Sequence, residues 1–291
     1  MLTLEKKNVK KESSKKNQQP KEKKEFKTVE FFGYQFPVEI TKSGKPGKIE
    51  KDIAIVKSIF DKGLENITHN DRLILLSVYN IAYHESGKIE GIFSLDSSAT
   101  NCSFCVKMRE YAAKHPEKNI ICGSCYDFRQ EQYKLQALAR HTLNMLIMET
   151  IEFTIEELAT LAVYGLVRIN SSGDSTNNIY AGNMIKFSIS HPQCNIAIWS
   201  KNTGSYINAC NQYGKPDNVT LIQSSVYVDK ATKPAKYFDF VFTVYFNENK
   251  VNEAIAAGAC ECNGKKCRDC GYKCYLHGWS GSANIAELLR K

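Results

Sequence analysis

Short apolar runs alternate with stretches of helical spacing along the second half of the chain. The apolar runs are β-rich and nearly unbroken, as expected for parallel strands that are covered on both faces. Strands that alternate with helices favour an α/β fold over an α+β fold. The expected strands span residues 166–174, 195–202, 218–226 and 237–246, and the expected helices between them span 177–192 and 204–213.

The first half of the chain begins with alternating aromatic residues, which predict a short strand or hairpin. Helical periodicity follows, with Asn70 or Asp71 as the expected N-cap of the second helix and Gly63 near the C-cap of the first. Thr154 and Glu157 form the pattern of a capping box. The expected elements are a hairpin at 29–40, helices at 50–64, 69–86, 126–151 and 154–165, and a strand within 88–100.

Polar residues follow several of the predicted strands at the point where each strand ends. Gly173 and Asp174 close "SSGD", Lys201 lies in "WSKN", and Ser224 lies in "QSSV". In a parallel α/β sheet these carboxyl ends form one rim, where ligands usually bind. We therefore expect these four residues to bind a ligand. Competing interpretations are an N-cap role for Asp174, a solvated loop position for Lys201 and an ordinary strand-end position for Ser224.

Charge is concentrated at the N-terminus. Residues 1–27 contain ten Lys and four Glu, which leaves only +2 of the total formal charge of +8 for the remaining residues. This Lys-rich tail is expected to be disordered and solubilising, and the alternative is an arm that binds nucleic acid. No run of eighteen apolar residues or secretory signal occurs, so the expected location is the cytoplasm, with no membrane partner.

Eleven cysteines are an odd number, and the cytosol keeps thiols reduced, so metal binding is the leading interpretation. The first set has the form Cys102-x2-Cys105-x16-Cys122-x2-Cys125. Two C-x2-C pairs at this separation are typical of a four-thiolate metal site, because each tight turn aims two sulfurs at one ion. Cys194 and Cys210 lack partners at ligand spacing and are expected to be small buried hydrophobes.

The second set of cysteines is more crowded. It comprises Cys262-x4-Cys267-x2-Cys270-x3-Cys274, with Cys260 as a spare thiol. This irregular spacing favours an iron–sulfur cluster, while a compact zinc site remains the alternative. Whether Cys260 or Cys262 is the ligand stays open.

The order of these motifs resembles a known superfamily. The strand "GIFSLD" runs into cysteines that end in "ICGSCY", a long helix follows, and the next strand ends in "SSGD" before a cysteine-rich tail. This order is similar to the radical-SAM partial (β/α) barrel. The resemblance implies a [4Fe–4S] cluster held by Cys122, Cys125 and either Cys105 or Cys102, with an open iron that binds S-adenosylmethionine. It also implies contact of the Gly173 motif with the methionine part, although the superfamily spacing C-x3-C-x2-C is absent.

The same region, about residues 90–280, also resembles cysteine-rich phage and prophage proteins of the "gene product 88" type. The expected fold is thus an α/β partial barrel of parallel strands with cysteine-rich metal-binding inserts. The expected function is iron–sulfur-dependent, radical-type chemistry on an unknown substrate. The alternative is a non-catalytic zinc module that engages nucleic acid or a protein. The expected segments are the tail (1–27), N-terminal strand and helical elements (28–85), the partial barrel (86–258) and the C-terminal cysteine-rich segment (259–291).

Overall fold

A computed structural model describes residues 24–43, 45–262, 266–276 and 283–289. Its core element is a sheet of eight strands in the order β3-β4-β5-β6-β7-β8-β10-β9. Every neighbouring pair is parallel except β3 with β4. The strands of this sheet are β3 (Ala82–Tyr83), β4 (Phe93–Leu95), β5 (Leu166–Ile169), β6 (Asn195–Ser200), β7 (Val219–Ser224), β8 (Phe240–Tyr245), β9 (Cys260–Glu261) and β10 (Asn284–Leu288). The predicted α/β class with parallel strands is confirmed.

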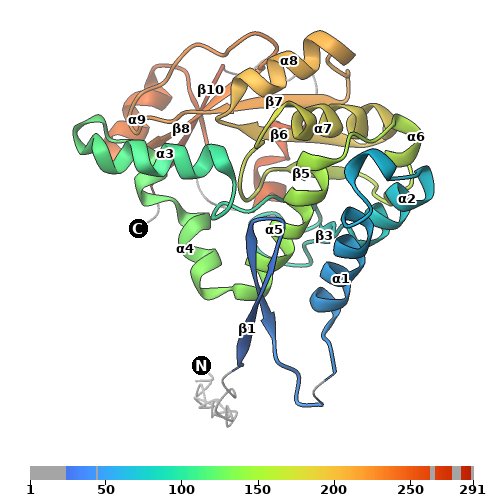
Figure 1. Ribbon diagram of the computed structural model, residues 1–291. Coiled ribbons are helices and arrows are strands. Elements are labelled where there is room, and N and C mark those ends of the chain that lie inside the picture. Colours follow the sequence, from blue (N-terminus) through green and yellow to red (C-terminus); the bar gives the residue numbers. More distant parts are fainter. Residues whose placement is uncertain (1–23, 44, 263–265, 277–282, 290–291) are drawn as a thin grey trace, which may run out of the picture.

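Helices pack around this sheet, and an antiparallel hairpin of β1 (Phe26–Phe31) and β2 (Tyr34–Glu39) lies beside α5 (Figure 1). The α-helices are α1 (Lys48–Phe60), α2 (His69–Val78), α3 (Ser103–Lys114), α4 (Tyr126–Tyr133), α5 (Leu135–Thr150), α6 (Ile155–Leu158), α7 (Asn178–Ser190), α8 (Thr203–Tyr213) and α9 (Glu248–Ala256). Short 3-10 turns are η1 (Leu64–Asn66), η2 (Pro116–Lys118), η3 (Ile121–Ser124), η4 (Cys267–Cys270) and η5 (Lys273–Tyr275). No helix in the described ranges is long and apolar enough to cross a membrane.

Strands β4 to β8 lie in the sheet in chain order. Because parallel crossovers are right-handed, strands added in one direction place their connecting helices on the same face. Side-chain alternation agrees with this arrangement. On β6, Ile196 and Ile198 join the main core with α5, α7 and α8, whereas Ala197 and Trp199 face the other side. The second face is covered by η5, whose Tyr275 is buried against Trp199.

The helix boundaries correct several predictions. The N-cap of α2 is Thr68, and Asp71 is its capping-box partner, so Asn70 and Asp71 were both wrong as N-caps. The helix ends at Val78 and not at 86, because the amide side chain of Asn144 bonds the backbone N–H and C=O of Asn80 at 3.0 and 2.7 Å. The expected helix at 126–151 is two helices that meet at Lys134, and the helix at 154–165 ends at Leu158.

Other expectations hold. The Thr154–Glu157 capping box is present, with both reciprocal hydrogen bonds. Cys194 and Cys210 are buried in the main core. Strand β1 begins at Phe26, inside the stretch predicted as tail, and residues 1–23 of that tail lie outside the described residues.

Candidate functional site

A cleft of about 510 Å³ opens at the carboxyl ends of the parallel strands. All four predicted rim residues line it: Gly173 and Asp174 after β5, Lys201 after β6, and Ser224 at the end of β7. Cys122 and Cys125 border the same cleft. The structure therefore brings the strand-end residues and half of the first cysteine set to one place.

Each C-x2-C pair of the first set is built around the start of a helix. Cys102 is the N-cap of α3 and Cys125 is the N-cap of α4. Each sulfur accepts a hydrogen bond from a backbone N–H three residues on, at 3.4 Å from Cys105 and 3.5 Å from Phe128. Helix N-termini favour thiolate over thiol, so both turns suit a thiolate ligand.

The four thiols of the first set are not equivalent. Cys105, Cys122 and Cys125 line one small pocket together with Asp174 and Lys201. Cys102 is completely buried behind it, with its sulfur 3.6 Å from the carbonyl oxygen of Asp174. Three thiols thus line this pocket, and the thiol of Cys102 lies directly behind it in contact with that of Cys105.

The electrostatics of this pocket centre on Lys201. Burial acts to lower the pKa of its ammonium group, but Cys122, Asp174 and the other pocket thiols favour the charged form, and the net shift is upward. A hydrogen bond with Cys102, together with burial, raises the pKa of Cys105 well above its usual value. Metal binding here would therefore displace protons from thiols.

Asp174 does not cap α7, whose N-cap is Asn177. Its buried carboxylate accepts hydrogen bonds from the Ser200 hydroxyl at 2.6 Å and from the backbone N–H groups of Ser175 and Lys201 at 2.7 and 2.6 Å. Burial raises the pKa of Asp174, partly offset by Lys201. Asp174 therefore ties the end of β5 to the end of β6.

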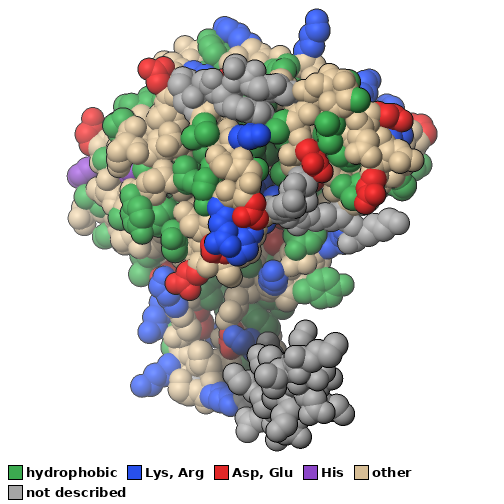
Figure 2. Space-filling view, turned by 180° about the vertical axis from the view of Figure 1, so that it is seen from behind, with side chains coloured by type: hydrophobic (Ala, Val, Ile, Leu, Met, Phe, Trp, Pro, Cys, Tyr) green, Lys and Arg blue, Asp and Glu red, His purple; other side chains and the backbone are tan. Residues whose placement is uncertain are grey.

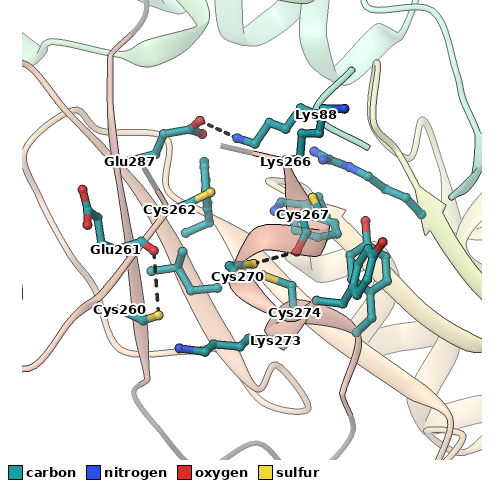
Figure 3. Close-up of a pocket in the computed structure, with 16 residues that line it drawn as sticks. Lys88, Cys260, Glu261, Cys262, Lys266, Cys267, Cys270, Lys273, Cys274 and Glu287 are labelled. Carbon is teal, nitrogen blue, oxygen red and sulfur yellow. Dashed lines mark hydrogen bonds and ion pairs between the residues drawn. The ribbon is translucent and has the colours of Figure 1, made fainter. Parts of the chain in front are cut away.

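The second set lines a smaller pocket of about 60 Å³ that adjoins this cleft, on the face of the sheet away from the main core. In Figure 3, the sulfurs of Cys262, Cys267, Cys270 and Cys274 gather around its middle, and Cys260 lies at its margin. Burial, followed by the influence of Cys262, Cys270 and Cys267, raises the pKa of Cys274 to about 12. Cys262 is the leading influence on Cys274 after burial, and Cys260 is not among the leading ones, so Cys262 is the better candidate for the fourth ligand.

Arg168 and Trp199 link the two regions, because both line the cleft and the second cysteine pocket. The guanidinium of Arg168 stacks over the Trp199 ring at 4.2 Å from its centroid. The cleft therefore extends from the first cysteine set to the wall formed by the second.

Among the residues that the structure describes, no three Cys, His, Asp or Glu side chains stand close enough together to hold one metal ion. The type of donor nevertheless suits a soft metal, since each set offers thiolate sulfur, the ligand of zinc and of iron–sulfur clusters.

Two acidic residues of α4 were missed by the sequence analysis. Burial raises the pKa of the Asp127 carboxyl to about 6, opposed by Arg168 and Lys201, and Asp127 lines the cleft. Glu131 is almost fully buried and accepts hydrogen bonds from the backbone N–H groups of Ala99 and Thr100 at 3.2 and 2.8 Å. Asp127 and Glu131 are four residues apart and therefore lie on one face of the helix that begins after Cys125. This spacing was the sequence signal that could have placed both acids near the cysteines.

Glu131→Gln is expected to lower the free energy of unfolding by about 3 kcal/mol. The amide cannot accept from both loop N–H groups and also pair with His141, whose ring lies 2.9 Å from the carboxylate. Thermal and urea unfolding would measure the loss. The matched control, Glu110→Gln on the exposed side of α3, should change stability little. Equal stabilities for the two variants would contradict this role of Glu131.

The Glu131–His141 pair also sets a pH window. Burial acts against both charges, but their mutual hydrogen bond lowers the pKa of Glu131 and raises that of His141. The stabilisation that Glu131 provides is present above the pKa of Glu in the unfolded chain. It is lost as the pH falls through the lower pKa of Glu131 in the folded protein. The histidine's contribution is present below its unfolded pKa and is lost as the pH rises through its elevated folded pKa. The difference in free energy of unfolding between the wild type and Glu131→Gln should therefore be largest at mildly acidic pH.

Basic and acidic side chains are interspersed over the face shown in Figure 2. Lys266 and Arg268, which lie among the second cysteines, both pair with Glu90 at 2.5 and 3.0 Å. These cations are thus partly neutralised within the protein. The nucleic-acid interpretation stays with the N-terminal tail, whose residues 1–23 lie outside the described residues.

No protein-family model matches the chain, and it has no significant match among the curated proteins or the solved structures.

Proposed function

We propose that this protein binds iron–sulfur clusters through its two cysteine sets and performs radical-type chemistry with S-adenosylmethionine on a substrate in the cleft. The supporting observation is the unequal placement of the first set. Cys105, Cys122 and Cys125 share one pocket beside the cleft, while Cys102 is buried behind it. Three thiolates would leave one iron of a [4Fe–4S] cluster open to a cosubstrate, whereas four would close the site.

We also propose that the parallel strands curve as a partial (β/α) barrel. Strands β4 to β8 follow one another in chain order, and helices cover one face while the cysteine-rich segment covers the other. Sequential winding of this kind is the winding of (β/α) barrels, whose ligands bind at the carboxyl ends of the strands. The cleft lies at those ends.

A bound cluster would supply one-electron chemistry, and the chain's own residues would organise the surroundings. Lys201 balances the negative charge of the thiolates of Cys105, Cys122 and Cys125. Asp174 fixes the backbone of Lys201 through a 2.6 Å hydrogen bond. Ser224 and Asp127 line the cleft where a substrate would lie.

The test is anaerobic purification followed by absorbance spectroscopy and analysis of iron, sulfide and zinc. Iron and sulfide are expected, together with a spectrum or EPR signal that changes when S-adenosylmethionine is added. Replacing Cys105, Cys122 and Cys125 by Ser should remove the response to S-adenosylmethionine and part of the iron. Cys210→Ala, in the main core away from both pockets, is the control. Zinc in both sets with no iron or sulfide would refute the proposal.

A further inference from the structure

Arg168 occupies an unusual position for a cation. It lies on β5 between Val167 and Ile169, which pack into the main core, and its side chain faces the opposite side with Trp199. Its Nε atom has no hydrogen-bond partner, and no described carboxylate lies within the 4.0 Å ion-pair limit. Arg168 is half-buried, and a cation that is partly removed from water without an ion pair costs free energy unless another group compensates it.

The nearby carboxylates are already engaged by uncharged donors. Asp96 accepts from the Ser94 hydroxyl at 2.7 Å and the backbone N–H of Ser172 at 3.0 Å. Asp174 likewise accepts from a hydroxyl and two backbone N–H groups. Asp96 and Asp174 are therefore occupied by these donors and form no ion pair with Arg168 or Lys201.

Lys201 provides a second cation in the same cleft. It follows β6, the strand next to β5, and its ammonium forms no ion pair with a described carboxylate. Asp127 influences the charge balance of both cations but forms an ion pair with neither. Two cations from adjacent strands, neither of them in an ion pair with a described carboxylate, therefore line this cleft.

We propose that the cleft binds a small molecule through an oxyanion group, phosphate or carboxylate, which Arg168 and Lys201 contact. Stacking on Trp199 holds the guanidinium plane in place, and the buried Nε has no hydrogen-bond partner. A guanidinium held in this way can bind an oxyanion with two hydrogen bonds. A cleft of about 510 Å³ is large enough for a metabolite-sized ligand. The oxyanion group would define the substrate class of the proposed function. Binding of the ligand does not depend on that function, and only its chemical conversion does.

The competing explanation is that Arg168 serves only the second cysteine set. Cys267 and Tyr275 are among the groups that favour its charge, and thiolates of a loaded site would neutralise it. In that case the cation would have no capacity left for a ligand once metal is bound. The two explanations differ in what the loaded protein does with an added anion.

The experiment is isothermal titration calorimetry of inorganic phosphate, and separately of acetate, into the full metal-loaded protein at constant ionic strength. We expect saturable binding of at least one probe, and the stronger one identifies the oxyanion. Arg168→Gln and Lys201→Gln should each weaken binding by about tenfold. Lys215→Gln, which removes a cation paired with Asp239 at 2.6 Å, should leave binding unchanged.

If Arg168→Gln does not fold, Arg168→Lys replaces it in the test. Lysine keeps the positive charge but lacks the paired N–H donors of the guanidinium, so this variant should bind the anion more weakly than the wild type. No saturable binding, equal binding by the Arg168 variants, or binding confined to metal-free protein would overturn the inference. Metal content measured on the same samples separates the two proposals. Iron-loaded protein that binds no anion refutes only this inference, and anion binding by protein that holds zinc but no iron refutes only the proposed function.

Discussion

Gly173→Ala is expected to destabilise the protein strongly and to remove metal from the first cysteine set. Gly173 has a φ of +71°, and a Cβ built there would lie 2.5 Å from the carbonyl oxygen of Ser97 and closer still to its hydroxyl. The left-handed backbone costs an L-residue about 1–2 kcal/mol, and overpacking adds about 1–3 kcal/mol. We expect a total loss of about 2–5 kcal/mol by thermal or urea unfolding.

The metal loss follows from where this contact lies. Gly173 is the point at which the loop after β5 touches the loop after β4, and the Ser97 hydroxyl donates to the carbonyl of Asp174 at 2.9 Å. The same carbonyl lies beside the sulfur of Cys102. A shift of either loop therefore displaces the first cysteine set, whereas the second set belongs to the C-terminal segment, which packs on β6 through Tyr275 and Trp199.

Gly165→Ala is the matched control. Gly165 has nearly the same φ, +69°, but a Cβ there would meet nothing within 4 Å. Gly165→Ala should therefore lose only the stability that the left-handed backbone costs an L-residue, and it should retain metal in both sets. Combining Gly173→Ala with Ser97→Ala should not restore stability, because the backbone oxygen of Ser97 remains in contact. Equal losses for Gly165→Ala and Gly173→Ala would contradict this explanation.

The α/β fold could be predicted because its signal is local. Strands β6 and β7 are buried on both faces and so appear as nearly unbroken apolar runs, and each run ends in polar residues that the parallel arrangement brings to one edge. This is why Gly173, Asp174, Lys201 and Ser224 could be expected together at one cleft. Strand direction alone brings these residues to one edge, whatever the details of packing.

What could not be predicted depends on contacts between distant residues. Strand β10 lies between β8 and β9, although it follows both in the chain, and "NIAEL" carries no signal of that position. Helix α2 ends where Asn144, far along the chain, captures the backbone of Asn80. No Gly or Pro marks the break between α4 and α5 at Lys134.

In the candidate site, too, local patterns could be predicted and contacts between distant residues could not. Spacing alone grouped the cysteines into two sets, but it could not decide between Cys260 and Cys262, since both precede the same turn. Arg168 was overlooked because a charged residue inside an apolar strand acquires meaning only when the opposite face of the sheet is known to border a cleft.

Cys262→Ser is expected to remove metal from the second set, whereas Cys260→Ser is expected to leave it in place. These half-buried cysteines lie two residues apart, so the two substitutions disturb the backbone alike and differ mainly in the thiol removed. Cys262 acts on Cys267 and Cys274 and joins their hydrophobic cluster, while Cys260 lies at the margin of the pocket. Iron, sulfide and zinc analysis of both variants would measure the difference.

The loss should also open one wall of the cleft. Metal binding contributes folding free energy to the segment that supplies its ligands, and Tyr275 in this segment covers Trp199 at a centroid distance of 6.0 Å. In a Trp279→Phe background, Trp199 is the remaining tryptophan, because the chain has two. Its emission should shift to longer wavelength in Cys262→Ser and stay unchanged in Cys260→Ser. Loss of metal in Cys260→Ser to the same extent would mean that the fifth thiol is a ligand, and an unchanged Trp199 signal in metal-free Cys262→Ser would mean that the wall folds without metal.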